Sequence, residues 1–203
     1  MARFVCATSF ETKKIVRLKS YNIPDELDDH GSTIVEAARA TSAATSFFEP
    51  VTIGKRKYVD GALGANNPVE EVWIEAQNIW CPEDGALEPL VKCFVSIGTG
   101  NPGLEPIGST AWKVLTDTMI KISTETERTA ERFAGGQRKL HDHKYFRFNV
   151  DQGLQNVGLD EYKKEGLIEA ATDGYLTTTA QKFRVQDCAN NLKTKTCVLE
   201  DFS

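Results

Sequence analysis

Asp60 lies where a strand-like run gives way to a turn, and this junction constrains the fold more than any other part of the sequence. The run at residues 57–59 leads into Asp60, and Gly61 and Ala62 follow before more small residues and a helix start. Because Asp-Gly is a common turn dipeptide, alone it indicates only a tight turn. With the segments on either side, it predicts a strand, a turn rich in small residues and then a helix, an order typical of α/β folds.

Strand-like and helix-like segments alternate along the whole chain. We expect strands near residues 4–7, 14–18, 57–60, 91–97 and 145–150, and helices near 33–46, 69–80, 109–134 and 160–182. This alternation predicts an α/β fold with a mainly parallel sheet covered by helices. The nearly continuous apolar run at 91–97 is typical of a strand covered on both faces.

Two of the expected helices carry start signals. Thr33 and Glu36 have the spacing of a capping box. Asn67 can cap the next helix, with Pro68 at its first position and the Glu70 carboxylate reaching back.

Length, charge and cysteine usage narrow the class of protein. The chain has 203 residues, and we expect residues 1–190 to form one domain and 191–203 a polar tail. A net charge of −5 gives no electrostatic reason to expect nucleic acid. We find no transmembrane-length apolar run and no secretory signal. Five cysteines without a Cys-x-x-Cys indicate reduced thiols and predict a cytoplasmic protein.

Two segments flank the Asp60 turn in a recognisable order. A small-residue helix at 38–44 precedes it, and a strand running into a glycine turn at 95–100 follows it. In this order the segments resemble the C-terminal half of a patatin-like phospholipase domain. Further stretches at 124–133, 145–150 and 158–161 are similar to a fungal, calcium-independent phospholipase-like branch of that family. The resemblance covers roughly residues 4–175.

The resemblance implies a fold and an activity. The fold would be a patatin-like three-layer sandwich, and residues 1–190 the C-terminal part of it. The reaction would be hydrolysis of a carboxylic ester in a phospholipid or other acyl lipid, with peripheral membrane contact. Asp60 would be the proton acceptor of a Ser–Asp dyad, in a motif completed by Gly61 and Ala62. The dyad implies no metal and no other cofactor.

The nucleophile that the resemblance implies is not in this sequence. The family places its serine in a Gly-x-Ser-x-Gly turn, and no glycine among these 203 residues has a serine two positions later. The glycine-rich oxyanion loop is absent as well. We therefore expect a sheet incomplete at its N-terminal side and no acyl transfer by the chain alone. The alternative is a catalytically inactive patatin-like remnant that serves as a binding or regulatory module.

Other patterns favour structural interpretations. Gly98, Gly100 and Gly103 fit Gly-x-Gly-x-x-Gly, but prolines interrupt the segment, so we predict a glycine turn and no dinucleotide site. His141 and His143 flank Asp142 without a recognisable third ligand, which predicts a loop without a metal. Structural interpretations also apply to Ser42 and Ser46 (packing or backbone hydrogen bonds), Trp73 and Trp80 (core and rim packing), His30 (an exposed turn) and the charges at 125–132 (a solvated helix face).

Overall fold

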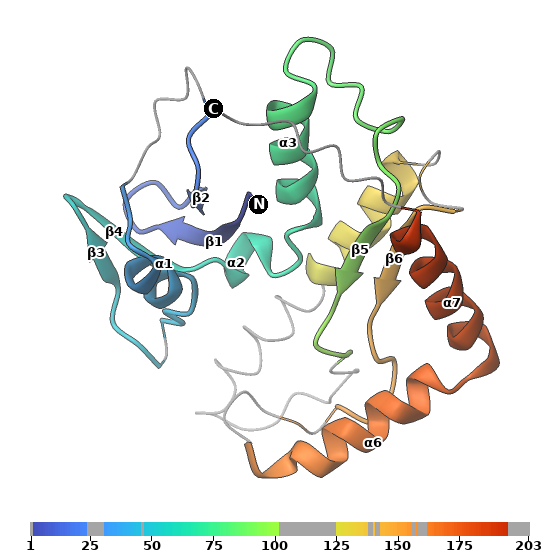
Figure 1. Ribbon diagram of the computed structural model, residues 1–203. Helices are drawn as coiled ribbons and strands as arrows, with labels where there is room; N and C mark the ends of the chain where they lie inside the picture. Colours follow the sequence, from blue (N-terminus) through green and yellow to red (C-terminus); the bar gives the residue numbers. More distant parts are fainter. Residues whose placement is uncertain are drawn as a thin grey trace. The chain divides into compact units, whose positions relative to one another are not determined.

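Backbone contacts divide the chain into two units. One unit holds residues 1–85 and 107–133, and the other holds 86–106 and 134–203. The computed structural model describes residues 2–23, 31–45, 47–101, 125–137, 140, 143–155, 157 and 162–194 (Figure 1). Each unit is described separately.

A four-stranded antiparallel sheet forms the centre of the first unit. Its strands are β1 (Phe4–Ser9), β2 (Ile15–Lys19), β3 (Val51–Ile53) and β4 (Arg56–Asp60), in the order β2-β1-β4-β3. Every neighbouring pair is antiparallel, with Ala7 of β1 opposite Asp60 of β4. The expectation of a mainly parallel sheet is wrong for these strands. The connections at residues 10–14 and 54–55 are short, and a connection this short joins antiparallel strands only.

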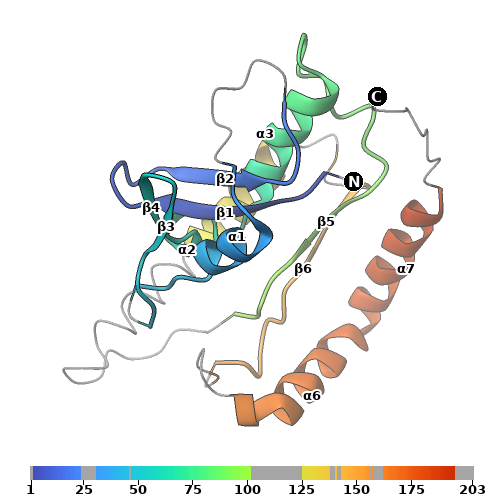
Figure 2. The same ribbon diagram turned by 60° about the vertical axis from the view of Figure 1, so that its left-hand side comes forward.

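Helix α1 (Ile34–Thr41) covers this sheet and lies against β1, β3 and β4 in both ribbon views (Figures 1 and 2). The predicted capping box is confirmed. Thr33 Oγ1 accepts the Glu36 N–H at 3.2 Å, and the Glu36 carboxylate accepts the Thr33 N–H at 2.8 Å. The core beneath the helix consists of Ala7, Leu18, Ala40, Ala43, Val51, Ile53 and Tyr58.

The end of α1 at Thr41 comes earlier than the predicted end near residue 46. The reason is a contact with the sheet. Two residues beyond the helix, the Ala43 carbonyl accepts the N–H of Asp60 at 3.0 Å. A carbonyl that binds β4 is lost to the helical hydrogen-bond pattern, so the chain leaves the helix where it joins the strand.

Two further helices follow the sheet, α2 (Ala62–Ala65) and α3 (Val69–Trp80). The predicted cap of α3 is wrong by one position, because Pro68 is the N-cap residue and makes no side-chain capping bond. The Glu70 carboxylate instead accepts two hydrogen bonds from Arg132, at 2.7 and 2.9 Å. Arg132 belongs to the helical stretch 125–136. The charges of that stretch therefore pair partly with α3 and not only among themselves.

The tryptophans of α3 behave as core and rim residues, as interpreted from the sequence. Trp73 is buried, and its ring meets Phe133 edge to face at 5.7 Å between centroids. Trp80 is 55% exposed at the end of the helix. Helix α3 thus presents one apolar face to the unit and a solvated face on the other side.

A buried ion cluster joins β2 to α3. Glu75 of α3 is only 1% exposed, and its Oε1 lies 2.8 Å from both Lys19 Nζ and the Tyr21 hydroxyl. Arg17 Nε lies 3.2 Å from Oε2, close enough for an ion pair although not aligned for a hydrogen bond. Arg17 and Lys19 alternate along β2, so the strand directs both to one face, and Tyr21 follows two residues after its end.

The second unit is built on a parallel strand pair, β5 (Phe94–Ile97) and β6 (Tyr145–Phe148). The pairing agrees with the parallel arrangement that we predicted for strands separated by a helix. Residues 91–93 are not strand, and the expectation of coverage on both faces is wrong. Val95 and Ile97 are 39% and 80% exposed. Alternate residues of a strand point to opposite faces of the sheet, and these two side chains lie on the exposed face.

A short 3₁₀ turn, η1 (Tyr162–Lys164), leads into two helices, α6 (Glu165–Leu176) and α7 (Thr179–Lys193), where we expected one helix over 160–182. The Thr177 and Thr178 hydroxyls donate to the carbonyls of Asp173 and Tyr175 at 2.7 and 2.9 Å. Thr178 is extended, which ends α6 and begins α7. Helix α7 continues through residues 191–193, beyond the point where we expected the polar tail to begin.

No disulfide links the cysteines in the described part of the chain. The nearest pair is Cys93 and Cys188, whose sulfur atoms lie 3.8 Å apart. Burial, together with the neighbouring Cys188, raises the pKa of Cys93 to about 12. This thiol is therefore mainly protonated at neutral pH.

Candidate functional site

Asp60 is the last residue of β4, and its main chain is held on both sides. Its N–H donates to the Ala43 carbonyl at 3.0 Å, and its carbonyl accepts the Thr8 hydroxyl at 2.9 Å. Pairing with Ala7 in β1 adds a third constraint. The position of the Asp60 side chain is therefore fixed by the sheet and not by a loop.

The Asp60 carboxylate is half-buried and carries one hydrogen bond, from the Ala62 N–H to Oδ1 at 2.8 Å. The ion pairs found in the described part of the chain do not include it. Burial raises the pKa of Asp60, and the Ala62 N–H partly opposes this rise. A carboxylate without a neighbouring cation and with a raised pKa is a stronger proton acceptor than an exposed one.

Position 61 requires glycine because a larger residue would collide with its neighbours, and not because the backbone has an unusual conformation. Its φ is −74°, which other residues adopt freely. A Cβ at this position would lie 2.6 Å from the Cys6 carbonyl oxygen and 2.8 Å from the Cys6 carbonyl carbon. The Thr41 hydroxyl donates to the same oxygen, so the oxygen is fixed in place. Ala62 begins α2, a short helix within the segment that the sequence predicted as a turn, and the predicted helix follows as α3.

We expect Gly61→Ala to lower the free energy of unfolding by about 1–3 kcal/mol, because the new methyl group meets backbone atoms that cannot move aside. The measurement is urea denaturation of the full chain. Gly135→Ala is the matched control. Gly135 lies in the helical stretch 125–136 with open space around it. This change is expected to stabilise by up to about 1 kcal/mol. Equal stability of the two variants would contradict the close approach.

Ser42, one of the two serines interpreted as structural, has the backbone partner expected of it. The Ser42 hydroxyl donates to the Ala38 carbonyl at 2.7 Å, which confirms the predicted backbone hydrogen bond. Ser46 lies outside the described residues, as do His30, His141 and Asp142. His143 is exposed in a turn. Among the described residues, no group of three or more potential ligands is placed to hold a metal ion.

The glycine turn after β5 packs around one side chain. Gly100 donates its N–H to Asn149 Oδ1 at 2.9 Å, and a Cβ at Gly98 would overlap the same amide. Gly100 also has a φ of +100°, which favours glycine. Gly103 lies outside the described residues. The turn's two described glycines thus have a packing role, in agreement with the interpretation as a structural turn.

The fold and the Asp60 turn define an α/β protein whose candidate site is a half-buried carboxylate at the end of β4, followed by a glycine in contact with the neighbouring strand β1. Residues 2–73 match the family model described as patatin-like phospholipase, and this range contains the whole antiparallel sheet and Asp60. This region of the chain belongs to the patatin-like phospholipase family.

Curated relatives carry names that agree with this family. The chain is 31% identical over 154 residues to "Calcium-independent phospholipase A2-gamma" of Homo sapiens, which covers 73% of the chain and 18% of the relative. It is 29% identical over 154 residues to "Phospholipase A I" of Arabidopsis thaliana, over 73% of the chain and 11% of the relative. The chain thus spans between about a tenth and a fifth of these relatives. Across the described residues, no helix has the length and apolarity needed to cross a membrane.

Proposed function

We propose that this chain is part of a patatin-type lipid acyl hydrolase in which Asp60 is the proton acceptor of a Ser–Asp dyad. The observation that carries the proposal is the half-buried Asp60 carboxylate, which has a backbone N–H as partner and a raised pKa. It lies in the region that matches the family model. The names of the relatives point to a phospholipid as the substrate.

The chemistry requires a base beside a hydroxyl. A serine hydroxyl is a poor nucleophile at neutral pH, so its proton must pass to a base in hydrogen-bond reach as it attacks the ester carbonyl. The Ala62 N–H binds Oδ1 and orients the Asp60 carboxylate, and we propose that Oδ2 takes the serine proton. Asp60 then gives that proton to the leaving alcohol. Later it activates the water that cleaves the acyl-serine.

The serine itself and the oxyanion donors are proposed to come from other sequence. These 203 residues contain no Gly-x-Ser-x-Gly, and Asp60 alone cannot form an acyl intermediate. A dyad of serine and aspartate uses no metal or organic cofactor. Its lipid substrate implies contact with a membrane surface, and a cytoplasmic location stays the expectation from the cysteine pattern.

A second candidate is a non-catalytic patatin-like module with a binding or regulatory role. The missing Gly-x-Ser-x-Gly favours this candidate, because a remnant without a nucleophile needs no base. The two candidates predict the same inactivity for the isolated chain. They differ in whether this chain supports ester hydrolysis when a serine nucleophile is supplied by another sequence.

A graft separates the two candidates. The aligned region of the human relative is replaced by the corresponding residues of this chain, and release of fatty acid from a phospholipid is measured. Hydrolysis by the graft supports the enzyme. A graft that melts cooperatively near the temperature of the parent protein but releases no fatty acid supports the non-catalytic module. The parent protein is the reference for full hydrolysis and for the melting temperature. A graft that does not fold is the reference for the background release of fatty acid.

A further inference from the structure

Two hairpins lie side by side at one end of the four-stranded sheet. Residues 10–14 connect β1 to β2, and residues 54–55 connect β3 to β4. Because β1 and β4 are antiparallel neighbours, both connections occur at the same end. The Phe10 N–H donates to the Lys57 carbonyl at 2.9 Å and ties the two hairpins together.

This end of the sheet concentrates positive charge. Its exposed cations are Lys13, Lys14, Lys55, Arg56 and Lys57, which we call the basic hairpin end. Glu11 is the one acidic residue within the two hairpins, and its carboxylate accepts the Lys57 N–H at 3.2 Å. The whole chain carries a net charge of −5, so this cluster opposes the average charge of the protein. A localised basic surface on an acidic protein favours a specific anionic partner.

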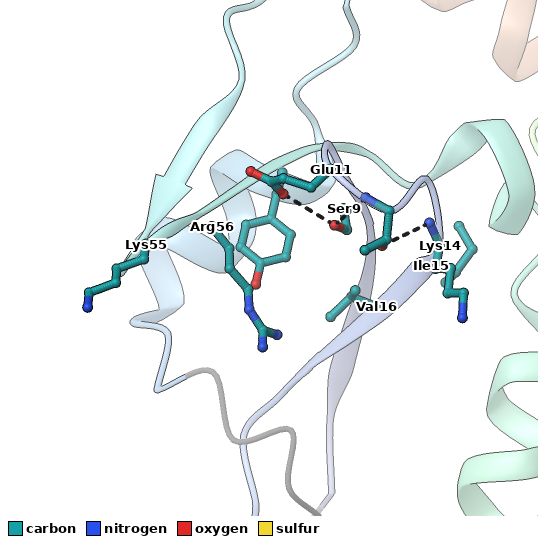
Figure 3. A pocket seen from close by; sticks show the side chains of 9 residues that line it. Ser9, Glu11, Lys14, Ile15, Val16, Lys55 and Arg56 are labelled. Carbon is teal, nitrogen blue, oxygen red and sulfur yellow. Dashed lines mark hydrogen bonds between the residues drawn. The ribbon is translucent and has the colours of Figure 1, made fainter.

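The basic hairpin end also offers an aromatic side chain and a pocket. Phe10 is 43% exposed, and Lys13 Nζ lies 4.3 Å from the centre of its ring. A pocket of about 420 Å³ opens between the hairpins. Figure 3 shows Lys55 and Arg56 on one side of it and Lys14 on the other. Thr12 lines the same pocket, and its hydroxyl can donate to phosphate oxygens, whereas the Ser9 hydroxyl donates to the Glu11 carboxylate at 3.4 Å.

We propose that the basic hairpin end docks on the surface of a membrane that contains anionic phospholipid. The lysines and Arg56 contact lipid phosphates. Phe10 lies at the depth of the lipid headgroups, where the aromatic side chains of membrane-binding surfaces are inserted. The charge complementarity and the exposed ring favour a lipid surface over a nucleic acid. This inference rests on the proposed lipid substrate, and it names where the chain meets that lipid.

The position of Asp60 fits this docking. Asp60 lies three residues beyond Lys57 on β4, a distance of about 10 Å along an extended strand. Docking through the hairpins therefore holds the candidate base close to the lipid surface and fixed to it by a continuous sheet. The surface and the carboxylate lie in the same unit of the chain.

Vesicle co-sedimentation of the full chain tests the docking. The probes are vesicles of phosphatidylcholine alone and vesicles of equal parts phosphatidylcholine and phosphatidylserine. We expect binding to the anionic vesicles that falls steeply with salt, and little binding to the neutral ones. Each lysine near an anionic surface contributes roughly fivefold to affinity. The triple variant Lys13→Ala, Lys14→Ala, Lys55→Ala is therefore expected to bind about 100-fold more weakly.

The matched control removes the same charge elsewhere. Lys92, Lys182 and Lys193 are exposed in the second unit, and their triple alanine variant is expected to keep most of the affinity. Equal loss in the two triple variants, binding to both vesicle types alike, or binding to duplex DNA in place of vesicles would overturn the proposal. The readout involves no catalysis. Hydrolysis of a monomeric short-chain ester by the graft tests the dyad independently, so either proposal can fail without the other.

Discussion

Asp60→Asn is expected to lower ester hydrolysis by an active graft by a factor of about 100 to 10,000, the range that a general base contributes. The amide keeps an oxygen that can accept the Ala62 N–H, so the geometry of the turn is retained. It cannot take a proton from serine. The measurement is turnover of a phospholipid by the graft with and without the substitution. Glu49→Gln, which converts an exposed carboxylate in the family-matched region to an amide, is the control and should leave turnover unchanged.

The same variant should not lose stability at neutral pH. Because the folded state raises the pKa of Asp60, folding favours the protonated form, and that contribution to stability is lost as pH rises through the folded pKa. Asn removes the unfavourable burial of charge at neutral pH. The advantage of Asp60→Asn should shrink as pH falls through the raised pKa of the folded Asp60, and it should have gone below the reference value of 3.8, where the carboxyl is protonated in both the folded and the unfolded state. Turnover retained by the variant, or turnover and stability lost together, would remove Asp60 from the proposed mechanism.

The second large effect is on stability. Glu75→Ala is expected to lower the free energy of unfolding by up to about 3–5 kcal/mol, because it removes the buried carboxylate that contacts both Arg17 and Lys19. Arg17 keeps a contact with Glu71 at 3.5 Å. The side chains of both cations are largely buried, at 21% and 11% exposed, so water can replace the lost carboxylate only in part. Urea denaturation of the full chain provides the measurement.

A neighbouring position on the same helix is the control for Glu75. Glu70 also forms an ion pair, with Arg132, but the two side chains are 36% and 57% exposed. Exposed pairs contribute about 1 kcal/mol or less, so Glu70→Ala should change stability little. If the two alanine variants lost similar amounts of stability, burial of the Glu75 cluster would not be the cause of its effect.

Local signals in the sequence predicted the parts of the fold that depend on neighbouring residues. The Thr33–Glu36 capping box needs only a spacing of three residues, and it forms as predicted. The Asp60 turn likewise depends on small residues that follow one another. The pattern around Asp60 also carried the resemblance to the family that the comparisons support.

Long-range contacts decided what local signals could not. The end of α1 depends on Ala43 meeting Asp60, and the cap of α3 on Glu70 meeting Arg132 across 62 positions. Nothing in the local spacing of β2 pointed to Glu75 as the partner of Arg17 and Lys19.

The sequence by itself therefore determined the strand–turn–helix around Asp60, the family of residues 2–73 and the absence of a Gly-x-Ser-x-Gly. Only the tertiary structure decided that the sheet of the first unit is antiparallel, that Gly61 is needed to clear Cys6, and that two lysine-bearing hairpins share one end. The physical reason is that turns and caps form among residues close in sequence. Strand pairing and burial bring together residues whose separation no local pattern records.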